Sequence, residues 1–408
     1  MSETIAIYVH LPWCVRKCPY CDFNSHVRPE NIPETEYVAA LLADLDGDLD
    51  LAAGREVASV FLGGGTPSLF GVGAIASLID GLAARLAFRA DAEITMEANP
   101  GTIEHGRFAG YARAGVNRVS LGAQSFDAAA LAALGRIHGP GEIRAAVSEL
   151  DAAGLHNFNL DLMYALPDQT REGALADLDA ALALGPAHLS RYQLTLEPGT
   201  VFHTRPPPLP DDDLAFVMQQ DGDARLAAAG FAQYEVSAYA RPGRQCRHNL
   251  NYWHFGDYLG IGAGAHGKAT ASGAVVRTEK PRSPRAYLAG GGRLGSIRRA
   301  VPVAELPFEF MLNGLRLVEG FRIADFERTT GLAAAVVTGK LAEYAAKGLV
   351  HPEDGGYRAT SLGLRFLNDL LAGFLPDETS RRGSGELYTA PSRFVPDRDF
   401  RDFVSEVR

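Results

Sequence analysis

The segment from Tyr8 to Cys21 reads YVHLPWCVRKCPYC and contains three of the four cysteines of this 408-residue chain. It begins within an apolar run, residues 5–9, that predicts a β-strand. Further apolar runs alternate with Ala/Leu-rich segments whose apolar residues recur at helical spacing. Strands that alternate with helices form parallel sheets through right-handed crossovers, and six such units favour a barrel or partial barrel. The expected strands are residues 5–9, 57–62, 94–97, 118–121, 158–162 and 188–194.

The pattern changes near residue 300, which predicts a second domain. Helices are expected at 304–317, 333–347 and 362–373, with a hairpin at 349–360, an order typical of a winged-helix-type module. Residues 241–270 are rich in Gly, Asn, His and aromatic residues without a clear period, and they predict loops. The predicted fold class is α/β, with a partial (β/α)6-type barrel at 1–240, a loop-rich segment at 241–300, a mostly helical, winged-helix-like domain at 301–375 and a polar tail at 376–408.

The composition limits the classes of partner and the cellular location that we expect for this chain. Lys and Arg number 39 against 49 Asp and Glu, a net charge of -10, whereas proteins that grip a phosphate backbone are usually basic. We therefore expect no nucleic-acid partner. No apolar run reaches the roughly 18 residues of a transmembrane helix, and the first residues lack the basic and apolar regions of a signal peptide. We expect a cytoplasmic protein, a compartment where disulfides are rare.

Cys14, Cys18 and Cys21 follow the first expected strand directly, at the end of a parallel barrel where such folds keep their chemistry. Three thiolates on one short loop can hold three irons of a cuboidal [4Fe–4S] cluster and leave the fourth iron without a protein ligand. That iron can bind the amino and carboxylate groups of S-adenosylmethionine, and an electron from the cluster can split its sulfonium. The alternative is a structural zinc ion with His10 or His26 as the fourth ligand, although zinc sites usually add a second ligand pair.

Glycine or polar residues stand at the ends of the next four expected strands. The second strand ends in Gly-Gly-Gly-Thr-Pro at 63–67 and the third in Glu97. The fourth leads to Gln124, and the fifth contains Asp161. Each feature alone is also typical of a turn, a capping acid or a surface amide. Because the carboxyl ends of parallel strands meet at one rim, we expect these residues to face one pocket, where glycines let backbone approach a ligand.

These motifs, taken in order over about residues 5–270, resemble the radical SAM superfamily and, more narrowly, the oxygen-independent coproporphyrinogen III oxidase group. The resemblance implies a radical SAM barrel and a [4Fe–4S] cluster held by Cys14, Cys18 and Cys21. It leaves open whether one or two S-adenosylmethionine molecules bind. The residues it implies for S-adenosylmethionine binding are Tyr8, Tyr20, Gly64, Gly65, Thr66, Glu97, Gln124, Arg136 and Asp161.

Two departures from the oxidases resemble the HemW-type heme chaperones instead. The oxidases carry a fourth cysteine where this chain has Phe23, and they have a longer N-terminal extension. Residues 246–253, CRHNLNYW, also contain the His-Asn-x-x-Tyr-Trp pattern associated with heme in those chaperones, which implies His248 as a heme ligand. Neutral imidazole is a common axial ligand, and Tyr252 and Trp253 offer flat surfaces to a porphyrin. Alternatively, His248 is a loop residue bonded to backbone and Trp253 belongs to the core.

The resemblance therefore implies a heme chaperone that binds a [4Fe–4S] cluster, S-adenosylmethionine and heme. It further implies transfer of heme to hemoproteins, among them respiratory enzymes at the membrane surface, and a homodimer. Arg241, Arg244 and Arg247 are candidates to pair with heme propionates. The alternative function is oxygen-independent coproporphyrinogen III oxidase, which oxidatively decarboxylates propionates. The residues leave open whether S-adenosylmethionine is cleaved, so we assign no catalytic residue.

Overall fold

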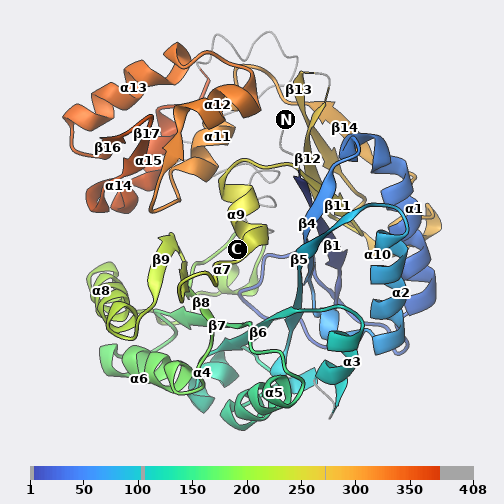
Figure 1. Ribbon diagram of the computed structural model, residues 1–408. Coiled ribbons are helices and arrows are strands. Elements are labelled where there is room, and N and C mark those ends of the chain that lie inside the picture. The colour runs from blue at the N-terminus through green and yellow to red at the C-terminus, as the bar shows by residue number, and fades with distance from the viewer. Residues whose placement is uncertain (1–3, 103–105, 272, 377–408) are drawn as a thin grey trace.

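A strongly curved sheet dominates the computed structural model, which describes residues 4–102, 106–271 and 273–376 (Figure 1). The sheet runs from β14 (Ile297–Ala300) to β9 (Ala232–Glu235), and helices cover its outer face. The C-terminal module, drawn in orange, lies beside the open side of this curve. The α/β partial barrel predicted from the alternating pattern is confirmed.

The centre of the sheet is parallel, and antiparallel strands extend both of its edges. In spatial order the parallel strands are β11 (Tyr258–Ile261), β1 (Thr4–Leu11), β4 (Glu56–Gly64), β5 (Phe88–Ala98), β6 (Arg118–Gln124), β7 (Phe158–Tyr164) and β8 (His188–Gln193). The antiparallel strands are β12 (His266–Ala271), β13 (Ala274–Glu279) and β14 beyond β11, and β10 (Ala238–Ala240) and β9 beyond β8.

Several of the outer helices begin after a capping side chain: Asp127, Thr170 and Asp211 each accept a hydrogen bond from a backbone N–H of the first turn. Asp211, for example, accepts from the Leu214 N–H (2.8 Å). None of the helices in the described ranges has the length and apolar character needed to cross a bilayer. The outer helices are α1 (Glu34–Ala52), α2 (Val72–Ala83), α3 (Arg107–Arg113), α4 (Ala128–Ala133), α5 (Pro140–Ala152), α6 (Arg171–Leu182) and α8 (Asp212–Ala228). Shorter elements are β2 (Trp13–Cys14), β3 (His26–Val27), η1 (Pro67–Leu69), η2 (Pro100–Thr102), α7 (Val201–Thr204), α9 (Arg247–Trp253) and α10 (Pro284–Ala289).

Each parallel strand turns apolar side chains outward and polar ones inward. On β6, Val119 and Leu121 belong to the core beneath the outer helices, whereas Arg118, Ser120 and Gln124 line the inside of the curve. The same period of two recurs on β5 and β7. The outward side chains pack between the sheet and the outer helices. The inward side chains form a polar interior that is suited to binding a ligand.

Residues 241–300 are the main departure from the predicted structure. The expectation of loops at 241–270 is wrong, because α9, β11 and most of β12 form there and continue the sheet. These strands are four to six residues long and contain several glycines, so they give little periodic signal. Just before this segment, β9 and β10 form two antiparallel strands.

The C-terminal module has its own core and resembles the expected winged-helix arrangement. A three-stranded sheet packs beside the helices, and the helix expected at 362–373 is interrupted at Phe366. The module core also includes Tyr252 and Tyr258, so the boundary at 300 stays a prediction. Except for Pro376, the predicted tail lies outside the described residues. Its elements are α11 (Leu306–Gly314), β15 (Phe321–Arg322), α12 (Ile323–Thr330), α13 (Ala335–Ala346), β16 (Val350–Glu353), β17 (Gly356–Ala359), α14 (Ser361–Arg365) and α15 (Leu367–Ala372).

A buried charge cluster ties the antiparallel extension to the first helix of the barrel. Lys280, which follows β13, contacts Asp44 (2.5 Å) and Asp48 (2.6 Å) on α1. Asp44 also accepts hydrogen bonds from the Gly262 N–H (3.0 Å) and the Tyr287 hydroxyl (2.8 Å). Lys280 therefore pairs with two carboxylates that have almost no access to water, and Asp48 also pairs with Arg298 (2.8 Å).

We expect Lys280→Met to lower the free energy of unfolding by about 3–5 kcal/mol, because it leaves the buried carboxylate of Asp44 without a cation among the described residues and leaves Asp48 only its contact with Arg298 (2.8 Å). Lys340→Met is the matched control, since Lys340 pairs with Glu343 on the exposed face of α13 (2.9 Å). That control should lose less than about 0.5 kcal/mol. Urea unfolding of both variants measures the difference, and equal losses would contradict the assigned role of Lys280.

Candidate functional site

A cavity of about 220 Å³ opens at the carboxyl ends of the barrel strands and extends into the polar interior. Residues from the cysteine loop, the strand ends and α9 share its wall. Tyr8 does not line it; its buried hydroxyl bonds the His10 Nδ1 (2.9 Å) behind the wall. The predicted site residues that line the cavity are Cys14, Cys18, Tyr20, Cys21, Gly64, Gly65, Thr66, Glu97, Gln124, Arg136, Asp161 and His248.

The cysteine loop is held against the glycine turn by backbone contacts. The Gly65 N–H donates to the Leu11 carbonyl (2.9 Å), and the Thr66 N–H donates to the Trp13 carbonyl (2.8 Å). A Cβ at Gly65 would lie 2.6 Å from the Trp13 oxygen, so only glycine permits this approach. The expectation that these glycines serve the ligand directly is therefore incomplete: they first position the loop that carries the sulfurs.

Each of the three cysteine sulfurs has a polar neighbour. The Thr66 hydroxyl donates to the Cys14 sulfur (3.5 Å), and the Arg136 Nη1 donates to the Cys18 sulfur (3.7 Å). The Cys21 sulfur lies 3.7 Å from the Ser25 hydroxyl. Hydrogen bonds to sulfur are typical of the thiolate ligands of iron–sulfur clusters and tune their potential. Sequence reasoning missed Ser25, which stands four residues after the last cysteine.

The arrangement of the donors fits a cluster better than a zinc ion. Within the described residues, no three Cys, His, Asp or Glu side chains converge as ligands of one metal ion would. Both ring nitrogens of His10 are already hydrogen-bonded, to Tyr8 and to the Asn24 carbonyl (2.9 Å each). The His26 Nε2 contacts the Asn24 side chain (3.2 Å). In a cuboidal cluster each thiolate binds a different iron, so separated sulfurs are what a cluster requires.

Burial makes the free thiols weak acids. It raises the pKa of Cys21 to about 11, against the opposing effect of the Ser25 hydrogen bond, and it also raises the pKa of Cys14. Without a bound cation these two sulfurs are therefore protonated at neutral pH. Iron would supply the positive charge that the thiolate forms need.

Two carboxylates, on β5 and β7 with β6 between them, form an acidic wall. Glu97 accepts a hydrogen bond from the Gly64 N–H (3.0 Å). Asp161 accepts from the Ser120 hydroxyl (2.9 Å) and the Asn159 amide (2.8 Å). Burial and the nearby charge of Asp161 raise the pKa of Glu97 to about 8, although the Gly64 hydrogen bond lowers it. Such hydrogen-bonding carboxylic acids can hold the amine or the ribose hydroxyls of a ligand.

Arg136 links the far side of the cavity to the cysteine loop. Its Nη2 donates to the Gly122 carbonyl (2.7 Å), whereas its buried Nε has no partner among the described residues. Gln124 ends β6 in the left-handed region, with a φ of 68°, which is unusual for a residue other than glycine. Its side chain thereby lies on the cavity wall.

His248 lies on a buried helix and not in a loop, so the alternative of a loop residue is wrong. Its Nδ1 is 3.0 Å from the Ser59 hydroxyl and its Nε2 is 2.9 Å from the Tyr252 hydroxyl. Burial, with the charge of Arg118, lowers the pKa of His248 to about 3 and keeps the ring neutral. The imidazole lines the cavity, but binding of a metal at Nε2 would require it to leave Tyr252.

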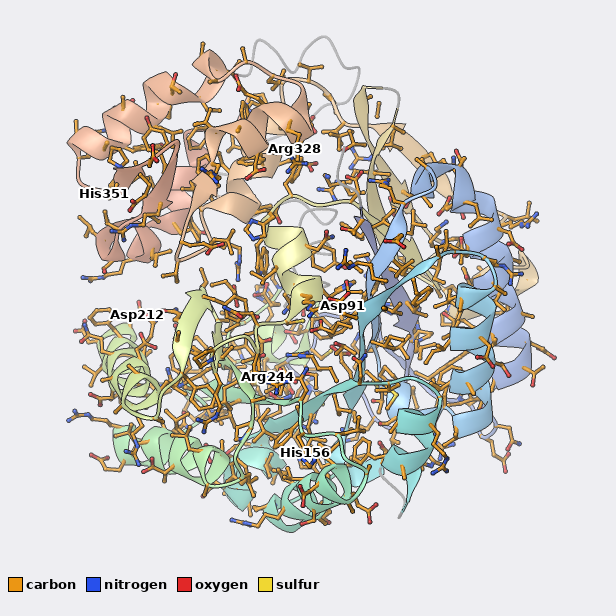
Figure 2. The ribbon with its side chains drawn as sticks, viewed as in Figure 1. Asp91, His156, Asp212, Arg244, Arg328 and His351 are labelled. Atoms are coloured by element: carbon orange, nitrogen blue, oxygen red, sulfur yellow. The ribbon has the colours of Figure 1, made fainter. Side chains whose placement is uncertain are left out.

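The other residues expected to face a porphyrin lie elsewhere. Tyr252 and Trp253 are buried in the core of the C-terminal module, where the Arg316 guanidinium stacks on Trp253 (4.3 Å). Arg247 pairs with Asp91 on β5 (2.9 Å), a residue labelled in Figure 2. Arg244, also labelled there, is exposed in the loop before α9. None of these four residues lines the cavity, so the structure assigns them no contact with a ligand in it.

Comparisons with known proteins agree with this geometry. The Radical SAM superfamily profile matches residues 8–181, and the HemN C-terminal domain profile matches residues 301–366. Among solved structures, coproporphyrinogen III oxidase (HemN) from Escherichia coli superposes with a TM-score of 0.76 over 91% of this chain and 89% of that one. The two sequences are 24% identical, so this likeness establishes the fold.

Curated relatives are much closer in sequence. The heme chaperone HemW of Escherichia coli is 52% identical over 91% of this chain and 98% of the relative. HemW of Haemophilus influenzae is 47% identical, over 92% and 98%. The mitochondrial radical S-adenosyl methionine domain-containing protein 1 of Bos taurus is 36% identical, over 92% and 88%.

Fold and site together define a radical SAM protein, a class whose cofactors are a [4Fe–4S] cluster and S-adenosylmethionine. Its long, close match to the bacterial chaperones makes the assignment narrower. The chain belongs to the HemW family.

Each of the single substitutions Cys14→Ser, Cys18→Ser and Cys21→Ser should remove most of the bound iron and of the brown absorption at roughly 400 nm. The control is Cys246→Ser, since the Cys246 thiol is buried against Glu93 (3.5 Å). That variant should retain its iron. Elemental analysis of anaerobically prepared protein measures both, and full iron in any of the three loop variants would contradict the ligand assignment.

Glu97 should make the ligand-free protein less stable as pH rises. Its unfolded pKa of 4.5 lies below its folded value of about 8, so the folded state binds the extra proton between these limits. Stability is then lost by up to about 1.4 kcal/mol per pH unit from roughly pH 4.5 to 8. Glu97→Gln should flatten this decline, whereas Glu343→Gln on exposed α13 should not. The free energy of unfolding, measured from pH 5 to 9 at intervals of roughly half a pH unit, tests this prediction. Identical slopes of this free energy against pH in the wild type and Glu97→Gln would refute it.

Proposed function

We propose that this protein is a heme chaperone, which binds a [4Fe–4S] cluster, S-adenosylmethionine and heme and passes heme to hemoproteins. The observation that carries the proposal is the 52% identity to Escherichia coli heme chaperone HemW over 98% of that protein. The likeness to the oxidase HemN, at 24% identity, is a likeness of fold. Phe23, at the position of the fourth cysteine of the oxidases, points the same way.

The cavity supports the part of the proposal that concerns the cluster and S-adenosylmethionine. Cys14, Cys18 and Cys21 would hold the cluster, with hydrogen bonds from Thr66 and Arg136 to two of the sulfurs. When bound and reduced, such a cluster supplies one electron to S-adenosylmethionine. The protein would orient that ligand between Arg136 and the acidic wall. Tyr8, which the resemblance also implies for this ligand, lies behind the cavity wall. The remaining implied residues line the cavity: Tyr20, Gly64, Gly65, Thr66, Glu97, Gln124 and Asp161.

For heme, we propose that His248 supplies an axial ligand from α9. A neutral imidazole is the form that binds iron, and burial holds His248 in that form. The Nε2 must exchange its hydrogen bond with Tyr252 (2.9 Å) for the metal. This exchange gives the proposal a clear structural consequence, since removing the Tyr252 hydroxyl would leave the nitrogen ready to bind.

The proposal includes partners as well. The name of the relatives supports heme and recipient hemoproteins. We further propose that the recipients include respiratory enzymes at the membrane surface and that the chain forms a homodimer. These two parts of the proposal rest on the family resemblance and not on the names of the relatives.

Heme titration of the reconstituted protein tests the function and the ligand together. We expect a Soret shift in the wild type and at least about tenfold weaker binding in His248→Ala. Tyr252→Phe should bind heme about 2–10-fold more tightly, because it removes a competing hydrogen bond to Nε2. The control is His351→Ala, an exposed histidine of β16 labelled in Figure 2, which should change nothing.

Unchanged affinity in both His248→Ala and Tyr252→Phe would reject His248 as the ligand. A parallel anaerobic assay with reductant, S-adenosylmethionine and coproporphyrinogen III separates the chaperone from the oxidase. Sustained formation of protoporphyrinogen would overturn the proposed function.

A further inference from the structure

Arg118 is a buried cation whose Nε has no hydrogen-bonding partner among the described residues. It begins β6, is 2% exposed and lies on the cavity wall. Its side chain makes no hydrogen bond or ion pair with any described residue, and its Nε is fully enclosed. A guanidinium carries five N–H donors, and buried donors left unpaired are costly to a folded protein. Arg118 therefore differs from the structural arginines of the same barrel.

The groups around Arg118 offset its positive charge but, within the described part of the chain, accept no hydrogen bond from its guanidinium N–H groups. The charge of Glu93 favours the cationic form of Arg118, with a smaller contribution from Asp161. Burial raises the pKa of Cys246 and of Tyr234 and keeps both groups neutral. The Glu93 carboxylate instead binds the start of α9, where it accepts from the Cys246 thiol (3.5 Å) and from the backbone N–H groups of the next two residues (3.3 Å each). The cross-strand neighbour of Arg118 is Thr95, whose buried hydroxyl also has no partner in the described part of the chain.

The position of Arg118 separates it from the cluster end of the cavity. Gln124, six residues on along β6, stands at the cysteine end, so about 20 Å of strand lies between the two Cα atoms. Arg136 is the arginine at that end, where it contacts the Cys18 sulfur. Arg118 instead shares the deep part of the wall with His248 and Asn249 of α9. A group bound by Arg118 would therefore lie at the end of the cavity that is farther from the cysteines.

We propose that the deep end of the cavity is a carboxylate-binding subsite in which Arg118 holds an anionic group of a ligand. A carboxylate matches the planar fork of a guanidinium and can accept two of its N–H bonds. Two ligands carry such a group: heme, through its propionates, and a second S-adenosylmethionine molecule, distinct from the one at the cluster, through its methionyl carboxylate. The heme source rests on the proposed function, whereas the subsite itself does not.

Paired ligands that differ only in the carboxylate test the subsite. Heme is compared with heme dimethyl ester, and S-adenosylmethionine with its decarboxylated form, on anaerobically reconstituted protein. We expect Arg118→Gln to weaken binding of one acid by about 10- to 100-fold. The ester or decarboxylated analogue of that ligand should bind the variant and the wild type alike. Whichever pair shows this difference identifies the source of the carboxylate.

Arg191→Gln is the matched control. Arg191 is also buried, but it donates to the Met218 carbonyl (2.7 Å) and stacks on Tyr164 (4.1 Å) outside the cavity. It should lower the melting temperature and leave both affinities unchanged. Ligand-free Arg118→Gln should melt close to the wild type, since it removes no hydrogen bond or ion pair made to the described residues. Arg118→Lys, which keeps the charge and loses the fork, should show a smaller loss of affinity.

Wild-type affinity of Arg118→Gln for both acids, or equal weakening for an acid and its analogue, would overturn the subsite. So would unfolding of both Arg118 variants, which would make Arg118 a fold contact. If wild-type protein binds no heme at all, the proposed function fails. The S-adenosylmethionine pair then still decides whether Arg118 binds a carboxylate.

Discussion

The close approach of two backbone segments, the end of β1 and the turn after β4, sets the geometry of the site. At Gly65 the chains meet so closely that a Cβ would lie 2.7 Å from the Pro12 carbonyl carbon. This contact fixes the start of the loop, and the Thr66 hydroxyl then reaches the Cys14 sulfur (3.5 Å). A larger residue would push the loop away from the strand ends. Sulfurs that are held in this way can bind a rigid inorganic cluster without a rearrangement of the loop.

The division of each strand into two faces explains why such a polar cavity is tolerated. Outward residues such as Ile7, Leu62 and Met96 are fully buried under helices and stabilise the sheet through the hydrophobic effect. The inward face can therefore carry Glu97 and Arg118, whose burial costs free energy instead of stabilising the fold. Helix α9 closes this interior, held by Glu93 and Ser59 from two strands. The same helix joins the core of the C-terminal module, so the cavity wall is connected to that module.

The sequence predicts the barrel well because its strands are apolar runs separated by long amphipathic helices. The strands after residue 240 are short and glycine-containing, and their sheet partners are distant in the chain, so local patterns do not reveal them. At the site, the cysteine spacing identifies the loop, but the resemblance could not show that both nitrogens of His248 are occupied. Arg118 was missed because a lone arginine in a strand is usually a surface residue. Its period-two spacing from Ser120 and Gln124 is the signal that places it inside.

The central claim is that three protein sulfurs bind an iron–sulfur cube and leave one iron for S-adenosylmethionine. Mössbauer spectroscopy of protein reconstituted with iron-57 tests this directly, with spectra taken before and after adding S-adenosylmethionine. The account predicts that one of the four irons changes its isomer shift on addition while the other three stay unchanged. Four irons that do not respond, or the absence of a four-iron spectrum, would contradict it.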